Sequence, residues 1–339
     1  MKKILVTGAE GFIGHHFVEH ILKNTDWDIV SLDRLDSTAT YDRITDIDSW
    51  QENKHRVKNV WHDLKAPLNE YVQKAIGKAD YIVHLAASSH VDRSITYPME
   101  FVMDNVVGTA NILDYARGLE GLEKFVYFST DEVFGPAPAN VAYKEWDRYR
   151  ASNPYAASKA GAEELCIAYE NTYKLPIIIT HCMNVFGERQ HPEKFLPMVV
   201  KKILFEEEVI IHSDPTRTKS GSRFYIHARD VADAVLFLLN TQTHNGDKFN
   251  IKGYREVENL ELAQMVAKIL NKPLKYQMLD FHSSRPGHDL RYALDGTKLQ
   301  EMGWYPKAPF EVRLEKCVKW MVDRPKWLLI DSEIVKKEI

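Results

Sequence analysis

Short apolar runs alternate with segments of helical spacing along the first half of the chain. Runs rich in β-branched residues predict strands at residues 4–7, 28–33, 57–63, 81–86, 124–129 and 176–184. Several are continuously apolar, as at residues 177–179, which is typical of strands buried on both faces of a parallel sheet. Between them, apolar residues such as Ile13, Phe17 and Ile21 have helical spacing. This alternation predicts an α/β doubly wound parallel sheet of the Rossmann type.

The pattern changes after about residue 187, where loops rich in Pro, Ser and Thr precede helical patterns at residues 258–270 and 309–322. We therefore expect a Rossmann domain over residues 1–187, to which residues 223–251 return. A smaller C-terminal substrate-binding lobe is expected over residues 188–339. We assign no role to the tail at residues 325–339.

Composition narrows the classes of function. A chain of 339 residues with 45% apolar and 27% charged residues is globular and long enough for two lobes. The net charge of −4 favours neither a nucleic-acid nor a membrane partner. Three scattered cysteines fit no disulfide framework, and the histidines lack metal-ligand spacing, so we expect no metal. No apolar run could span a bilayer, and we expect a cytoplasmic protein.

A glycine-rich turn follows the first predicted strand. Gly8, Gly11 and Gly14 have GxxGxxG spacing and lead into a helix, so the backbone can approach a pyrophosphate at the helix N-terminus. Asp33 ends the next strand, where a carboxylate binds ribose hydroxyls and repels a 2′-phosphate. This set predicts NAD as the cofactor, while Arg34 beside Asp33 leaves NADP as a disfavoured alternative.

Tyr155 and Lys159 are four residues apart at the start of a predicted helix, and they therefore lie on one helix face. A tyrosine acts as a base near neutral pH only if its pKa falls from about 10 towards 7. A neighbouring lysine and the positive ring of an oxidised nicotinamide would stabilise the phenolate. The pair predicts a catalytic base beside the cofactor.

Thr130, Asp131 and Glu132 end a buried strand, at the edge where open α/β sheets bind ligands. Two adjacent carboxyl groups suit an elimination, in which one removes a proton from carbon and the other protonates a leaving hydroxyl. On a regular strand the two would point to opposite faces. We expect the chain to leave extended geometry here, as Gly135 and Pro136 suggest.

Residues 8–14, 84–87, 129–135 and 155–159 resemble the extended short-chain dehydrogenase/reductase family. Within it, residues 89–94, 130–133 and 285–289 resemble the nucleotide-sugar 4,6-dehydratases, most closely the dTDP-glucose 4,6-dehydratases. The resemblance implies that Tyr155, aided by Thr130 and Lys159, takes the 4-hydroxyl proton as hydride passes to NAD. Glu132 then takes the C5 hydrogen, Asp131 protonates the leaving 6-hydroxyl, and hydride returns to C6.

The resemblance also implies binding residues and an oligomeric state. To the cofactor site it adds Phe12, Ile13, Asp63, Leu64, Leu85, Ala86 and Ala87, with Tyr155 and Lys159. To the nucleotide-sugar site it assigns Ser89, His90, Asn184, Lys194, Arg223, Asn259, Arg285, His288 and Tyr292. A homodimer is expected through helices over residues 101–116 and 160–173.

The chain departs from the dTDP-glucose pattern at several positions, including Ser88, Phe134 and Ser284, so the nucleotide and the hexose stay open. A 4-epimerase or a UDP-glucuronate decarboxylase of the same fold is the first alternative. Neither has an evident need for adjacent carboxyl groups. A non-catalytic NAD-binding regulator is the remote alternative. Such proteins often lose the tyrosine or the lysine, whereas this chain keeps both.

Overall fold

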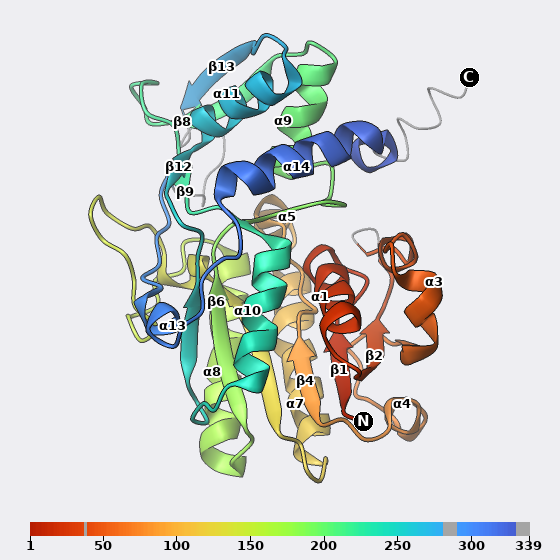
Figure 1. Cartoon of the computed structure of the whole chain (residues 1–339). Helices are drawn as coiled ribbons and strands as arrows, with labels where there is room; N and C mark the ends of the chain where they lie inside the picture. Colours follow the sequence, from red (N-terminus) through yellow and green to blue (C-terminus); the bar gives the residue numbers. More distant parts are fainter. Residues whose placement is uncertain (37–38, 281–289, 330–339) are drawn as a thin grey trace.

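The computed structural model describes residues 1–36, 39–280 and 290–329 of the chain. At its centre lies a parallel sheet of seven strands in the order β11-β6-β5-β4-β1-β2-β3 (Figure 1). The strands of this sheet are β1 (Lys3–Thr7), β2 (Asp28–Asp33), β3 (Val57–Trp61), β4 (Tyr81–His84), β5 (Lys124–Thr130), β6 (Ile177–Cys182) and β11 (Lys248–Ile251). The predicted α/β doubly wound fold is confirmed.

The strand order reverses beside β1, because the chain builds β2 and β3 on one side and then returns to place β4 on the other. Thr7 at the end of β1 pairs with Leu32 of β2 and with His84 of β4. The loops after these strands therefore meet at one edge, next to the reversal. In open α/β sheets this is the crevice where ligands bind.

Helices cover both faces of the sheet (Figure 1). On one face, α1 (Phe12–Asn24) and α10 (Ala228–Asn240) contact each other, and Phe17 and Val235 lie in their shared core. On the other face, α4 (Glu70–Ile76), α7 (Gly108–Arg117) and α8 (Pro154–Tyr173) bury side chains such as Ile112 and Cys166. Burial on both faces explains why the strands are apolar throughout.

A further group of elements packs around its own core at the top of the view in Figure 1. Its elements are α9 (Phe195–Leu204), β8 (Val209–Ser213), α11 (Asn259–Leu270), β13 (Tyr276–Asp280) and α14 (Phe310–Asp323). Strands β8 and β13 pair in parallel, which the sequence did not predict. Helix α10 and strand β11 lie between these elements along the chain but belong to the central layer. The domain boundary at residue 187 stays a prediction.

The helix predicted over residues 101–116 has a widened central part. It consists of α6 (Pro98–Phe101), the π-helical stretch η2 (Val102–Val107) and α7. The remaining short elements are α2 (Asp42–Thr45), α3 (Trp50–Asn53), η1 (Lys54–Arg56), α5 (Val91–Thr96), η3 (Asp131–Phe134), β7 (Val185–Phe186), β9 (Ser222–Arg223), β10 (Ile226–His227), β12 (Val257–Glu258), α13 (Thr297–Glu301) and η4 (Pro325–Leu328). None of the helices over the described residues has the length and apolar character to cross a membrane.

Candidate active site

The turn after β1 is closely packed and needs its glycines. Gly8 has a φ of 70°, and its N–H donates a 2.9 Å hydrogen bond to the carbonyl of Leu32. A Cβ on Gly8 would lie 2.7 Å from the backbone nitrogen of Ala86, and one on Gly14 would overlap the carbonyl oxygen of Gly8. Side chains at these positions would force the loop apart.

Helix α1 begins directly behind this turn. Gly11 is its N-cap, and no side chain caps the first N–H groups. An uncapped helix N-terminus beside a glycine turn presents backbone donors and a partial positive charge. The backbone therefore fits a pyrophosphate at this position.

Asp33 ends β2 next to the turn and is 7% exposed. Its carboxylate accepts backbone N–H bonds from Glu10 at 3.1 Å, Arg34 at 2.8 Å and Leu35 at 3.0 Å. Burial raises the pKa of Asp33, and these hydrogen bonds oppose that rise. They also fix the orientation of a carboxylate that lines the cavity, as binding of ribose hydroxyls requires.

One cavity of about 1480 Å³ joins the glycine turn to the end of β5. It exceeds the roughly 300–1,000 Å³ of an ordinary small-molecule pocket, so it has room for a dinucleotide and a second ligand. Every predicted cofactor and catalytic residue lines it: Gly8, Gly11, Phe12, Ile13, Gly14, Asp33, Asp63, Leu64, Leu85, Ala86, Ala87, Thr130, Asp131, Glu132, Tyr155 and Lys159. The described part of the chain contains no cluster of three or more His, Cys, Asp or Glu that could hold a metal.

The chain leaves extended geometry at Asp131 and Glu132, as the sequence analysis expected. Thr130 is still extended, and the 3₁₀ helix η3 begins at Asp131, ahead of Gly135. The Thr130 hydroxyl donates to Asp131 Oδ1 at 3.0 Å and accepts the N–H of Glu132 at 3.4 Å. Because of this turn, Asp131 and Glu132 both line the cavity.

The two adjacent carboxyl groups have different surroundings. Asp131 is 5% exposed, and its Oδ2 has no hydrogen-bond partner among the residues that the structure describes. Burial, together with the neighbouring charge of Glu132, raises the pKa of Asp131 to about 7. Glu132 Oε2 accepts hydrogen bonds from Asn153 Nδ2 at 3.0 Å and from the Tyr292 hydroxyl at 3.4 Å. Asp131 can thus hold a proton near neutral pH, while the Glu132 carboxylate is stabilised by two hydrogen-bond donors.

Helix α8 carries Tyr155 and Lys159. Asn153 caps it, with Oδ1 accepting the N–H of Ala156 at 2.8 Å, and Pro154 occupies its first turn. Lys159 Nζ donates to the carbonyl of Phe128 at 2.7 Å, and burial lowers the pKa of this lysine to about 7. The helix therefore fixes both side chains at the end of β5.

The protein groups alone do not lower the pKa of Tyr155, although a base near neutral pH requires a lowered value. Burial and the charge of Glu132 raise the pKa of Tyr155, and a hydrogen bond with Thr130 only partly offsets them. Lys159 directs its ammonium group at a carbonyl oxygen instead. A cation at the nicotinamide position is what the predicted base requires.

The predicted substrate residues fall into three groups. Ser89, His90, Asn184 and Lys194 line the cavity. Arg223, Asn259 and Tyr292 are not among its lining residues; Asn259 and Tyr292 each bond a residue that is, and Arg223 contacts Tyr292. Arg285 and His288 lie outside the described residues.

The three residues that do not line the cavity make contacts close to it. Tyr292 is 3% exposed and bonds Glu132, while the Arg223 guanidinium lies 4.6 Å from the centre of the Tyr292 ring. Asn259 Oδ1 accepts a 2.7 Å hydrogen bond from Tyr225, which lines the cavity. None of the three is among the residues that line the cavity, and their direct contact with a substrate stays a prediction.

Sequence reasoning missed several residues of the cavity wall. Arg43 is 3% exposed, and its guanidinium donates to the carbonyls of Arg189 at 3.1 Å and Glu10 at 3.3 Å. Trp327 of η4 lies with its ring 5.9 Å from that guanidinium. The described start of the C-terminal tail, residues 325–329, therefore reaches the cofactor side of the cavity. The apolar run Trp327-Leu328-Leu329 near the start of the tail was the available signal.

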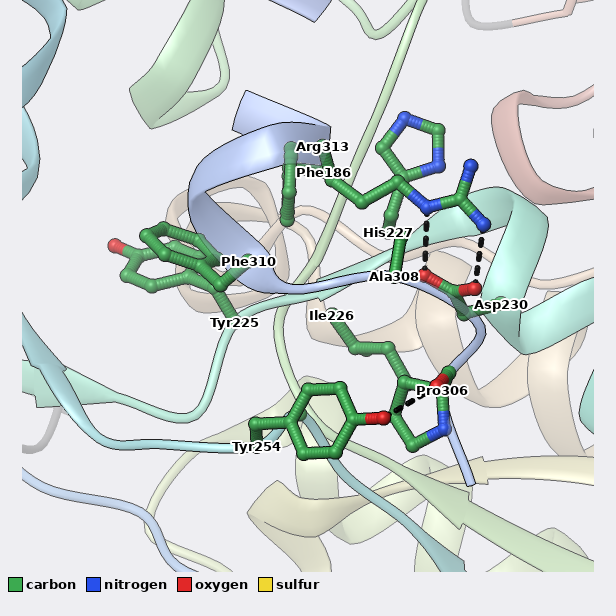
Figure 2. A pocket seen from close by; sticks show the side chains of 11 residues that line it. Phe186, Tyr225, Ile226, His227, Asp230, Tyr254, Pro306, Ala308, Phe310 and Arg313 are labelled. Carbon is green, nitrogen blue, oxygen red and sulfur yellow. Dashed lines mark hydrogen bonds and ion pairs between the residues drawn. The ribbon is translucent and has the colours of Figure 1, made fainter. Parts of the chain in front are cut away.

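Figure 2 shows a second pocket at the junction between α10 and α14. Its volume of about 10 Å³ suffices for one water molecule. Asp230 of α10 accepts hydrogen bonds from Arg313 of α14 at 2.6 and 3.0 Å and from the N–H of Lys307 at 3.0 Å. This pocket is too small for a substrate, and its ion pair ties the central layer to α14.

Comparisons with known proteins agree with this geometry. The chain is 34% identical to a dTDP-glucose 4,6-dehydratase of Escherichia coli, over 96% of this chain and 95% of the relative. It is 35% identical to one of Neisseria gonorrhoeae, over 95% and 96% of the two chains. The resemblance to the nucleotide-sugar dehydratases is thereby confirmed.

Solved structures match over the same extent. DesIV, a dTDP-glucose 4,6-dehydratase of Streptomyces venezuelae solved with NAD bound, superposes with a TM-score of 0.86 at 31% identity, over 96% of this chain and 98% of DesIV. A UDP-glucose 4-epimerase of Thermus thermophilus, also with NAD, gives 0.84 at 26% identity, over 95% and 99%. The family model of the GDP-mannose 4,6-dehydratases matches residues 5–317. The chain therefore belongs to the GDP-mannose 4,6-dehydratase family.

Proposed function

We propose that this chain is an NAD-dependent nucleoside-diphosphohexose 4,6-dehydratase that converts dTDP-glucose to dTDP-4-keto-6-deoxyglucose. The chain is an enzyme of the family named above, and a relative with a similar structure was solved with NAD bound. The observation that carries the proposal is the turn at the end of β5, which brings Asp131 and Glu132 to the cavity that holds Tyr155. A dinucleotide held by the glycine turn and Asp33 would supply the hydride acceptor, as NAD⁺, for oxidation at C4 and the hydride donor, as NADH, for reduction at C6, while the proton held by Glu132 returns to C5.

In the oxidation, Tyr155 accepts the proton of the sugar 4-hydroxyl, and Thr130 supports the phenolate through their hydrogen bond. Lys159 fixes the end of β5 through the carbonyl of Phe128 and adds positive charge when protonated. The resulting 4-ketone acidifies the hydrogen on C5.

In the elimination, Glu132 accepts the C5 proton, and its bonds to Asn153 and Tyr292 hold the carboxylate in place. Asp131 donates a proton to the departing 6-hydroxyl, which leaves as water. The pKa of about 7 leaves Asp131 partly protonated at neutral pH, as a general acid must be.

The nucleotide would lie beyond the sugar, towards the residues that follow β6. Asn184 and Lys194 line the cavity there and supply donors for a diphosphate. Three of the relatives described above carry dTDP-glucose in their names, which supports dTDP as the nucleotide.

The 4-epimerases are the same-fold alternative, because structures of such enzymes also match. Epimerisation returns hydride to C4 and breaks no bond at C6. A buried carboxyl group with a raised pKa at Asp131 therefore favours the dehydratase. The proposed role would fail if the purified chain inverted C4 of a nucleotide sugar and released no water.

The proposal includes a homodimer formed through α6, η2, α7 and α8. Exposed apolar side chains gather on and just before these elements: Ile95, Tyr97, Met99, Val102 and Met103. Such patches mark contact surfaces. Light scattering at micromolar concentration should give twice the chain mass, and a monomer would contradict it.

All three cysteines are unpaired, which supports a reducing, cytoplasmic location.

Product mass tests the activity. The full-length protein is incubated with NAD⁺ and, separately, with dTDP-, UDP-, CDP- and GDP-glucose. We expect dTDP-glucose to give a product lighter by one water, with no net accumulation of NADH. If none of the nucleotide sugars loses water, the proposed function is wrong.

A further inference from the structure

Arg34 occupies a position that bears on the choice of cofactor. It directly follows Asp33 at the end of β2, beside the expected site of the adenosine ribose. In dinucleotide-binding folds, an arginine near this point accommodates the 2′-phosphate of NADP. The sequence alone therefore leaves NADP open.

Carboxylates face all three edges of the Arg34 guanidinium. Asp36 Oδ2 accepts from Nε at 2.9 Å and from Nη2 at 2.7 Å. Asp104 takes the opposite edge, with Nη1 at 2.6 Å and Nη2 at 3.0 Å. Asp63 Oδ2 lies 3.6 Å from Nη1. A planar fork engaged on every edge has no donor pair left to offer a phosphate.

Asp104 is held more rigidly than Asp36. Its side chain is 9% exposed, against 33% for Asp36, and it accepts a 2.5 Å hydrogen bond from the Ser88 hydroxyl. The next residue, Asn105, accepts the N–H of Ser88 at 2.8 Å and donates to the Ser158 hydroxyl at 2.8 Å. These bonds lock Asp104 against the ends of β4 and α8.

The backbone around Asp104 departs from regular α-helical geometry. Asp104 and Asn105 lie in the π-helical stretch η2, and such stretches interrupt α-helices mainly at functional sites. The widened turn lets Asp104 reach Arg34 while the next side chain bonds Ser88.

The charge around this edge also opposes a phosphate. Four carboxylates, those of Asp33, Asp36, Asp63 and Asp104, lie around three cations, Arg34, Lys65 and Arg43. A 2′-phosphate would add further negative charge to a site that already has an excess.

We propose that Asp104 is a specificity residue for the cofactor: by clamping Arg34, it denies the 2′-phosphate its arginine and so selects NAD over NADP. The inference rests on the proposed function for the presence of a dinucleotide site. It adds to Asp33 a second determinant, supplied by a helix distant from it in sequence.

The test compares dissociation constants of NAD⁺ and NADP⁺, measured by titration calorimetry on the full-length protein. Asp104→Asn keeps the shape of the side chain and removes its charge. We expect NADP⁺ to bind about tenfold more tightly or better, since a freed arginine can make charge-assisted bonds, and NAD⁺ binding to change less than about threefold. Asp48→Asn, at an exposed carboxylate outside the cavity, is the charge-matched control and should change neither constant.

A second pair of variants separates the clamp from simple charge removal. In Arg34→Gln/Asp104→Asn the gain for NADP⁺ should vanish, and a gain that survives would overturn the clamp. Asp36→Asn, on the more exposed side, should give a smaller gain even if Asp104→Asn does not fold. If both Asp104→Asn and Asp36→Asn bind NAD⁺ normally and gain nothing for NADP⁺, the inference is wrong. A wild-type chain that binds neither dinucleotide would instead contradict the proposed function.

Discussion

Two neighbouring residues carry the proposed elimination because their surroundings differ. Asp131 is buried, one of its oxygens has no partner within the described part of the chain, and burial raises its pKa to about 7. Glu132 is held by two side-chain donors. The first can give up a proton at neutral pH and the second can accept one, which is the division that an acid–base elimination needs.

Glu132→Gln should separate oxidation from elimination. The glutamine keeps the shape but cannot accept the C5 proton, so bound NAD⁺ should be reduced by dTDP-glucose while no water is lost. Nicotinamide absorbance and product mass measure the two steps. Tyr155→Phe, which lacks the base for the first step, is the control and should show no reduction. A folded, NAD-binding Glu132→Gln chain that still dehydrates the sugar would refute the assigned role.

Asp131→Asn should slow the reaction and stabilise the fold. Loss of a general acid costs roughly 10²–10⁴-fold in rate. The pKa of Asp131 is raised on folding, so ionising it opposes folding as pH rises from the unfolded value of 3.8 through about 7. The variant should therefore melt at least about 2 °C above wild type at pH 8 and show a smaller difference at pH 5. Calorimetry at both pH values checks this, and an unchanged difference would contradict the burial argument.

At this scale, the residues within contiguous motifs were predictable. Gly8, Asp33 and Tyr155 are recognisable because their spacing follows one strand, one turn or one helix. Asp104 and Trp327 were not, because they reach the cavity through contacts between segments far apart in the sequence.

Single elements align several groups at once. The first turn of α8 begins at Asn153, whose side chain caps the helix with one atom and holds Glu132 with the other. The same helix presents Tyr155 and Lys159 to the end of β5. Its cap is thus a positioning residue as well as a stabilising one.

Asn153→Ala should lose both functions. We expect a stability cost of about 1 kcal/mol from the lost cap and a fall in kcat larger than any change in KM, since Glu132 loses a donor. Asn69→Ala is the matched control, because Asn69 caps α4 through the N–H groups of Tyr71 and Val72 far from the cavity. It should lower the melting temperature alone. Equal kcat values for the two variants would show that Asn153 acts only on stability.

Apolar patterning identified the central strands, because burial on both faces leaves continuous runs. It did not identify the π-helical stretch η2, since one widened turn barely alters apolar spacing. The departure from extended geometry at Asp131 and Glu132 was expected from the Gly135-Pro136 sequence that follows, and the structure shows it as a 3₁₀ turn. Local hydrogen bonds of Thr130, invisible in the sequence, place its start.

The whole molecule depends on how α14 is fixed to the central layer. One buried tie is the ion pair between Asp230, 2% exposed, and Arg313 (Figure 2). The sequence indicated that the chain returns to the first layer near these positions. It could not indicate which charges would meet there.

Arg313→Met should destabilise the fold by about 3 kcal/mol, because it leaves the buried Asp230 carboxylate without its ionic partner. Arg255→Met is the control: Arg255 pairs with Glu261 and Glu311 at the surface and should cost less than about 1 kcal/mol. Urea unfolding measures both. Equal losses would show that the buried pair does not join the two parts.

The measurement that tests the central claim most directly follows one hydrogen. The full-length protein is incubated with NAD⁺ and dTDP-glucose carrying deuterium at C4, and the product is analysed by mass and NMR. A 4,6-dehydratase moves that hydride within one molecule, so we expect a 4-keto-6-deoxy sugar with the deuterium at C6. Deuterium retained at C4 of an intact hexose, in either configuration, would contradict the proposed function.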